Sequence, residues 1–155
     1  MTNIKHEKTV ALIKPDGVKR GLIGEIITRV EKRGLKIISL EMFQATKEQI
    51  DGFYPQDEKW IKRLGEKTLK NYEHYGFNAQ KELGTEDPLE IGKMVREWLV
   101  NFMISGPMVK MIIGGIHAID MVRKIVGSSM PSQAEMGTIR GDFSVDDSTA
   151  ANRNK

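Results

Sequence analysis

The sequence contains no cysteine, which excludes disulfides, thiol catalysis and cysteine metal sites. It contains no apolar run near the roughly 20 residues that a membrane-spanning helix needs, and its first eight residues lack the apolar stretch of a signal peptide. We therefore expect a cytoplasmic protein with no membrane partner. Neither the phosphate-loop pattern GxxxxGK[ST] nor the dinucleotide pattern GxGxxG occurs, so the common nucleotide-binding folds are not indicated.

What the sequence does contain is ordinary for one globular domain. Its 155 residues are 39% apolar and 29% charged, enough for a buried core, and we expect a single domain over residues 1–155. The net charge is +3, which is compatible with an anionic ligand. No nucleic-acid-binding motif accompanies that charge, so we expect no specific nucleic-acid partner.

Hydrophobic spacing predicts alternating strands and helices in the first third of the chain. Thr9–Ile13 is a short apolar run that ends at Lys14-Pro15-Asp16-Gly17, which favours a buried strand followed by a turn. The apolar positions from Ile23 to Val30 follow one helix face. A second strand is expected over residues 35–43, and then a helix from the N-cap Thr46 to about Tyr54.

The remainder continues this alternation. Residues 55–87 are charged and have weak helical spacing, so we predict a helical insert there. Asp87-Pro88 starts a strong helix, residues 108–113 form a third strand, and the core face of the next helix includes Ile119. The segment 138–143 is expected to lead into a last strand. This order predicts an α/β (α+β) class, as a ferredoxin-like βαββαβ sandwich with a helical insert.

Three basic positions stand beside glycine turns and are candidates for binding phosphate. Lys14 ends a predicted buried strand and can place its ammonium at the sheet edge, and Arg140 lies in Gly137-Thr138-Ile139-Arg140-Gly141-Asp142-Phe143. Arg123 should face outward from its helix, with the Ser129 hydroxyl in the loop that follows. Asp142 would orient a neighbouring basic group. The plain alternatives are a solvated lysine, a solubility arginine and a surface ion pair.

Together these segments resemble a known family. Lys14-Pro15-Asp16-Gly17 with Arg20-Gly21, then Ser105-Gly106-Pro107, then the 137–143 segment, are similar in order and spacing to nucleoside diphosphate kinases. The resemblance covers about residues 8–54 and 98–144. The stretch between them resembles an extended-insert version of the family.

The resemblance implies ping-pong transfer of the γ-phosphate of a nucleoside triphosphate to a nucleoside diphosphate through a phosphohistidine. It implies Lys14 at the transferred phosphate, Tyr54 near the nucleophile, and Arg123 and Arg140 at the β-phosphate region. Ser129 stands where the family has a threonine, and Pro131 matches the loop that builds the oligomer interface. Either Val95 or Trp98 would meet the base. No cluster of residues has metal-ligand spacing, so Mg²⁺ is expected to arrive on the nucleotide phosphates.

The resemblance further implies ATP, GTP and other nucleoside di- and triphosphates as partners, and a homo-hexamer or homo-tetramer. The family's motif Asn-x-x-His is not completed in this sequence; Arg153-Asn154-Lys155 either echoes its first residues or lies in an insertion before it. None of His6, His74 and His117 matches the nucleophile, which is expected after Lys155. The 155 residues alone are then expected to be inactive. The alternatives are a nucleotide-binding module without turnover and a regulatory ferredoxin-like domain.

Overall fold

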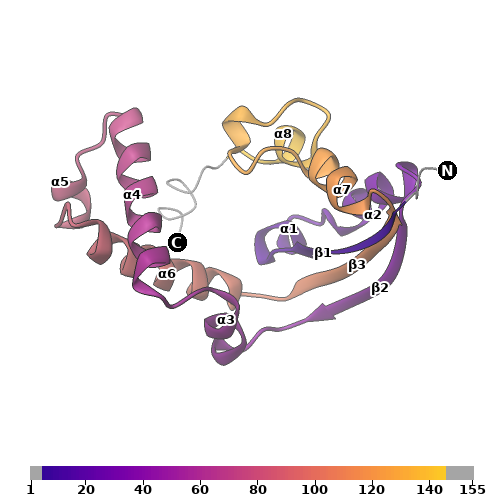
Figure 1. The fold of residues 1–155 in the computed structure, drawn as a ribbon, viewed down its shortest axis with the longest axis horizontal. Coiled ribbons are helices and arrows are strands. Elements are labelled where there is room, and N and C mark those ends of the chain that lie inside the picture. Colours follow the sequence, from indigo (N-terminus) through magenta and orange to yellow (C-terminus); the bar gives the residue numbers. More distant parts are fainter. Residues whose placement is uncertain (1–4, 146–155) are drawn as a thin grey trace. The chain divides into compact units, whose positions relative to one another are not determined.

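The computed structural model describes residues 5–145, which form two compact units. The first unit comprises residues 5–44 and 106–145, and the second comprises residues 45–105. The predictions made for Arg153, Asn154, Lys155 and the polar tail lie outside the described residues. Each unit is described by itself below, with the element labels of Figure 1.

The first unit is built on an antiparallel sheet whose central strand is the last of the three. Its strands are β1 (His6–Ile13), β2 (Lys36–Phe43) and β3 (Met108–Ile116), in the order β1-β3-β2. Both edge strands pair antiparallel with β3. The expected α/β class is confirmed, since a helical segment joins β1 to β2 and a strand from far along the chain inserts between them.

The helices of this unit cover one face of the sheet. Alternate residues of β3, Val109, Met111 and Ile113, are at most 2% exposed and pack with Val30 and Val122. Each such side chain, fully buried, contributes about 1.5–3 kcal/mol. Figure 1 shows α2 and α7 above the sheet. The helices are α1 (Pro15–Lys19), α2 (Ile23–Lys32), α7 (Ala118–Val126), the 3-10 turn η1 (Pro131–Gln133) and α8 (Ile139–Phe143).

Two expectations about this unit are wrong. Ile119 was placed on the core face of its helix, but it is 41% exposed, and Ala118 and Val122 are the buried residues of α7. The segment expected to lead into a last strand is instead the short helix α8, and residues 144 and 145 after it are not in a strand. The hydroxyl of Thr138 caps α8 by accepting from the Gly141 N–H at 3.0 Å, a local bond that favours a helix start.

The second unit is helical, and the starts of two of its helices were predicted from the sequence. It contains α3 (Lys47–Phe53), α4 (Glu58–His74), α5 (Ala79–Leu83) and α6 (Pro88–Met103). Thr46 caps α3 in a reciprocal capping box with Gln49, as expected from the sequence. The cap at Asp87 is confirmed as well, because its carboxylate accepts from the Leu89 N–H at 3.0 Å.

Two glycines let α4 and α6 cross with their backbones in contact. A Cβ on Gly65 would lie 1.7 Å from the Pro88 carbonyl oxygen, and a Cβ on Gly92 would lie 1.9 Å from the Ile61 carbonyl oxygen. Any side chain at either position would therefore force the helices apart. The predicted insert, 55–87, holds α4 and α5; its status as an insert relative to the family stays a prediction.

Candidate functional site

Lys14 occupies the position that the sequence assigned to it, directly after β1 and before α1. Its carbonyl oxygen accepts from the Val18 N–H at 3.1 Å, and Pro15 fills the first helical position and is buried. The side chain reaches solvent, yet the surrounding protein lowers the pKa of Lys14. Burial is the main cause, the charge of Asp16 opposes it, and the charge of Arg140 lowers the pKa further. The charge of Arg140 therefore acts on Lys14.

Arg140 is held at the end of the helix that carries Arg123. Its Nη1 donates to the Gly127 carbonyl oxygen at 2.9 Å, and the Gly127 N–H donates to the Arg123 carbonyl oxygen at 2.9 Å. The guanidinium is half-buried, and this burial lowers the pKa of Arg140 from its ordinary value. The end of β1, the end of α7 and the start of α8 thus each carry a basic residue within one unit.

Arg123 itself is exposed, as expected, and lines a hollow of about 700 Å³ with Gly127, Ser128 and Thr138. Ser129 is exposed in the loop after α7 and is not among the described residues that line this hollow. Pro131 begins η1 further along the same loop. The structure therefore brings Lys14 and Arg140 together and joins Arg140 to the backbone of Arg123, while Ser129 lies two residues beyond that junction.

The segment 137–143 is fastened to the rest of its unit by Arg29, in an arrangement we call the arginine clamp. Arg29 pairs with Glu25 at 3.0 Å and with Asp142 at 2.8 Å, and its Nη1 donates to the Gly137 carbonyl oxygen at 3.2 Å. Its guanidinium also lies 4.7 Å from the centre of the Phe143 ring. The clamp consists of these five residues, and it fixes the segment that presents Arg140.

Asp142 completes the clamp by bonding in two directions. It accepts from the Gly137 N–H at 2.8 Å and from Arg29, and these two bonds, in that order, hold the pKa of Asp142 below its ordinary value. Asp142 does hold a basic group, but that group is Arg29 on α2 and not a residue beside it in the sequence. Gly141 is required beside it, since a Cβ there would lie 2.0 Å from the Glu135 carbonyl oxygen.

Tyr54, Val95 and Trp98 belong to the second unit. Tyr54 is half-buried, its ring lies 5.1 Å from that of Phe53 and 6.2 Å from that of Trp60, and burial raises the pKa of its hydroxyl. Val95 is 2% exposed, whereas Trp98 is half-buried. Of the two residues considered for the base, Trp98 alone has surface available in this structure.

Arg96 holds the turn that carries Tyr54. Its guanidinium pairs with the Asp51 carboxylate at 3.0 Å and donates to the carbonyl oxygens of Asp51, Tyr54 and Pro55 at 3.0 to 3.2 Å. Its side chain is only 14% exposed. These bonds end α3 and fix the start of the loop that follows it.

Three arginines position these segments through contacts that were not predicted from the sequence: Arg20, whose Nη1 donates to the Phe143 carbonyl oxygen at 2.6 Å, Arg29 and Arg96. The spacing of Glu25 and Arg29, four residues apart on a helix, was the one local signal. The long-range partners of all three have no signature in local sequence.

The described residues hold no helix long and apolar enough to cross a membrane. In the same part of the chain, no group of three or more His, Asp or Glu side chains is placed to hold a metal ion.

Comparison with known proteins gives a consistent result. The family model described as nucleoside diphosphate kinase matches residues 7–81 and 89–153. A nucleoside diphosphate kinase of Pyrobaculum aerophilum is 49% identical over 140 residues, which are 90% of this chain and 76% of that protein.

Solved structures agree. The crystal structure of an NDP kinase from Pyrobaculum aerophilum matches with a TM-score of 0.87 and 45% identity, over 96% of this chain and 82% of that one. A nucleoside diphosphate kinase from Halobacterium salinarum in complex with CDP matches with a TM-score of 0.62 and 30% identity, over 96% of this chain and 74% of that one. On the family model and the sequence identity together, this chain belongs to the nucleoside diphosphate kinase family.

Proposed function

We propose that this chain binds the polyphosphate of nucleoside tri- and diphosphates at Lys14, Arg123 and Arg140, in the phosphotransfer reaction of its family. The observation that carries the proposal is that Arg140, which donates to the Gly127 carbonyl oxygen at the end of the helix of Arg123, lies within electrostatic range of Lys14, more than 120 residues away in the chain. Like charges held together are unfavourable unless an anion neutralises them. A bound polyphosphate supplies that anion and favours the charged form of Lys14.

The proposed roles follow from where each group is held. Lys14 lies at the end of a strand, and its ammonium acts as a point charge that faces the phosphate being transferred. One N–H of the Arg140 guanidinium donates to Gly127, and the remaining N–H groups are proposed to donate to phosphate oxygens. In the transfer, the bond from the γ-phosphorus to the β–γ bridging oxygen breaks as a bond to an imidazole nitrogen forms, and the diphosphate leaves. Fixed positive charge around the transferring group is most of what this reaction needs from a protein.

Neither His6 nor His117 fits the role of nucleophile. Both lie at the opposite end of β1 from Lys14, and eight strand residues span roughly 26 Å. His74 ends α4 in the second unit, with its ring 4.9 Å from that of Tyr75. We therefore expect little acid-labile label on these 155 residues when they are incubated with γ-labelled ATP; strong label on any of the three would contradict this assignment.

The substrate is proposed to be the magnesium complex of the nucleotide. Asp142, the acidic group nearest Arg140 in sequence, is engaged by Arg29 and Gly137, so it is not free to take a metal. The phosphate oxygens of the nucleotide are suitable ligands for Mg²⁺. We further propose Trp98, rather than Val95, as the aromatic surface for the base, because Val95 is 2% exposed whereas Trp98 is half-buried.

A homo-oligomer is proposed on the resemblance to the family and on the exposed apolar edge of β2. Leu40 and Met42 lie on one face of β2 and are 51% and 58% exposed, and within residues 5–145 this strand pairs with β3 alone. Light scattering at micromolar concentration is expected to give a multiple of the 17.5 kDa chain mass, and a monomer would contradict the proposal.

The test of the nucleotide site is the binding of ADP with Mg²⁺, measured by titration calorimetry on the whole chain. Lys14→Ala and Arg140→Ala should each remove a charge-assisted contact, which costs about 1.5–3 kcal/mol or roughly 10- to 150-fold in affinity. Lys62→Ala, an exposed lysine of α4, is the matched control and should leave affinity unchanged. If millimolar ADP does not bind, or if both site variants bind as well as the control, the assignment is wrong.

A further inference from the structure

A hydrogen bond from Arg20 joins the two segments that carry Lys14 and Arg140. The Nη1 of Arg20 donates to the Phe143 carbonyl oxygen at 2.6 Å, across 123 positions of the chain. Arg20 ends α1, the helix that begins directly after Lys14. Phe143 is the last residue of α8, the helix that contains Arg140. The bond therefore connects the C-terminal ends of two short helices, one of which starts at Lys14 while the other contains Arg140.

The α1 side of this connection is fixed by backbone hydrogen bonds. The Val18 N–H donates to the Lys14 carbonyl oxygen at 3.1 Å, and the Arg20 N–H donates to the Asp16 carbonyl oxygen at 3.0 Å. At a helical rise of about 1.5 Å per residue, the Cα atoms of Lys14 and Arg20 lie about 9 Å apart. α1 thus holds these two residues at a set separation.

The α8 side is fixed in the same way. The Ser144 N–H donates to the Arg140 carbonyl oxygen at 3.1 Å, which closes the turn that runs from Arg140 to Phe143. Among residues 5–145, the Phe143 carbonyl oxygen accepts from Arg20 alone, and Arg20 forms no ion pair. A guanidinium that donates to one carbonyl oxygen makes a charge-assisted bond, which is stronger than a bond between neutral groups.

The arginine clamp does not replace this bond, because it ties the same segment to a different element. Arg29 contacts Gly137, Asp142 and the Phe143 ring, and it belongs to α2. None of these contacts involves α1 or Lys14. The clamp therefore fixes α8 on α2, whereas the bond from Arg20 fixes α8 relative to α1.

We propose that Arg20 is a positioning residue of the phosphate site, which sets the separation of Lys14 and Arg140 by bonding the end of α1 to the end of α8. This inference rests on the proposed nucleotide site. The charge of Arg140 lowers the pKa of Lys14, so the two cations repel each other in the absence of an anion. An ion pair could hold α8 against that repulsion, but its carboxylate would also repel the polyphosphate. A neutral carbonyl acceptor avoids this conflict.

The test is a double-mutant cycle for the binding of ADP with Mg²⁺, measured by titration calorimetry on the whole chain. Arg20→Ala should weaken binding about 3- to 10-fold, because Arg140 is no longer held at its distance from Lys14. In the Arg140→Ala background the same change should weaken binding less than about twofold, because the guanidinium that Arg20 positions is gone. Arg20→Lys should restore part of the loss, since an ammonium can donate to the same carbonyl oxygen.

A second measurement needs no nucleotide. Hydrogen exchange of the Ser144 amide should become faster by about threefold or more in Arg20→Ala, because the turn that carries Arg140 is less well held. An unchanged exchange rate would show that Arg20 does not fix α8 and would overturn the proposal.

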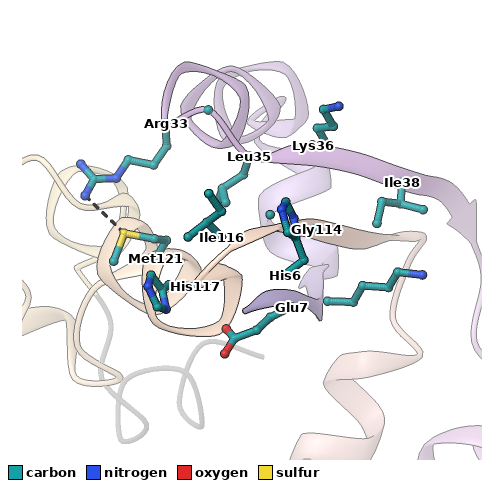
Figure 2. Close-up of a pocket in the computed structure, with 13 residues that line it drawn as sticks. His6, Glu7, Arg33, Leu35, Lys36, Ile38, Gly114, Ile116, His117 and Met121 are labelled. Carbon is teal, nitrogen blue, oxygen red and sulfur yellow. Dashed lines mark hydrogen bonds between the residues drawn. The ribbon is translucent and has the colours of Figure 1, made fainter. Parts of the chain in front are cut away.

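Two variants serve as controls. Lys19→Gln removes an exposed positive charge one residue away, so it reports on charge alone. Arg33→Ala removes the bond of an equally exposed arginine, which donates to the sulfur of Met121 at 3.3 Å beside a hollow at the opposite end of β1 from Lys14 (Figure 2). Both variants should bind ADP as tightly as the wild type does.

The outcomes separate this inference from the proposed site. If the wild type does not bind millimolar ADP, the nucleotide site fails and this inference fails with it. If Arg140→Ala weakens binding but Arg20→Ala matches the two controls, this inference alone is wrong. Equal losses from Arg20→Ala with and without Arg140 would show that Arg20 acts on the nucleotide directly, which also overturns the positioning role. Because Arg20 is exposed, its variants are expected to fold.

Discussion

The two units each rely on one arginine to fix a loop, and they use it differently. Arg29 holds the 137–143 segment through the Asp142 carboxylate, the Gly137 carbonyl oxygen and the Phe143 ring, and it also pairs with the carboxylate of Glu25 on its own helix. Arg96 holds the end of α3 through one carboxylate and three carbonyl oxygens, and it is less exposed, 14% against 21%. A guanidinium bonded to backbone serves as a structural fastener, whereas one bonded to carboxylates remains sensitive to salt and pH.

The largest effect should come from Arg96→Ala. This change removes a donor from three carbonyl oxygens, of which, among the described residues, only that of Asp51 keeps another donor, Gln56 Nε2 at 3.1 Å, and it unpairs the Asp51 carboxylate. We therefore expect a loss of about 2–4 kcal/mol in the free energy of unfolding of the second unit. Urea denaturation followed by tryptophan fluorescence measures it, since Trp60 and Trp98 both lie in that unit. Arg63→Ala, at an exposed position of α4, is the control. If Arg96→Ala and Arg63→Ala unfold with equal free energies, Arg96 is not a structural fastener of the second unit and does not differ from Arg29 in the way described above.

A smaller effect is expected from Arg29→Gln, and it should appear in binding. Without the clamp, the segment that presents Arg140 is less well fixed, so we expect ADP to bind about 3- to 10-fold more weakly, on the premise of the proposed nucleotide site. Arg29→Lys should rescue this only in part, because an ammonium cannot reproduce the planar fork. Lys32→Gln on the same helix is the control, and an ADP affinity unchanged by Arg29→Gln would remove the positioning role.

The smallest effect concerns pH. Because the folded state lowers the pKa of Asp142, its contribution to stability is complete above the ordinary carboxylate pKa and is lost as pH falls through the lowered value. As the pH is lowered from about 5 to about 2, the unfolding temperature of the wild type should therefore fall more steeply than that of Asp142→Asn. Identical slopes for the two proteins would show that the clamp is not pH-sensitive.

Local signals in the sequence predicted much of the fold. The caps at Thr46 and Asp87 are bonds between residues two or three apart, so they can be recognised without tertiary information. The helix at 139–143 was missed, although Thr138 is also a cap, because the segment is too short to show periodicity. Ile119 was misplaced because α7 presents Ala118 to the sheet, and alanine carries little weight in an apolar pattern.

The candidate site was predictable only in part. Residue types beside glycine turns pointed to Lys14 and Arg140, but their closeness depends on how α8 folds back onto the end of α7. Arg29 reaches Gly137 across 108 positions and Arg96 reaches Asp51 across 45, and no local pattern encodes such pairs. The sequence left open whether Val95 or Trp98 meets the base. The burial of Val95 favours Trp98, and burial depends on tertiary packing that the sequence does not display.

The crossing of α4 and α6 constrains where insertions and deletions can be accepted in the sequence. Gly65 packs against the backbone of Pro88, and Gly92 packs against the backbone of Ile61. If either helix slid or rotated by one residue, a side chain would replace a glycine at the contact and would clash with the backbone of the other helix. Lengthening the connection at 75–87 leaves both contacts in register, whereas a single residue added between Ile61 and Gly65 would misalign them. Variation in length should therefore accumulate in the connection and be absent from the helices themselves.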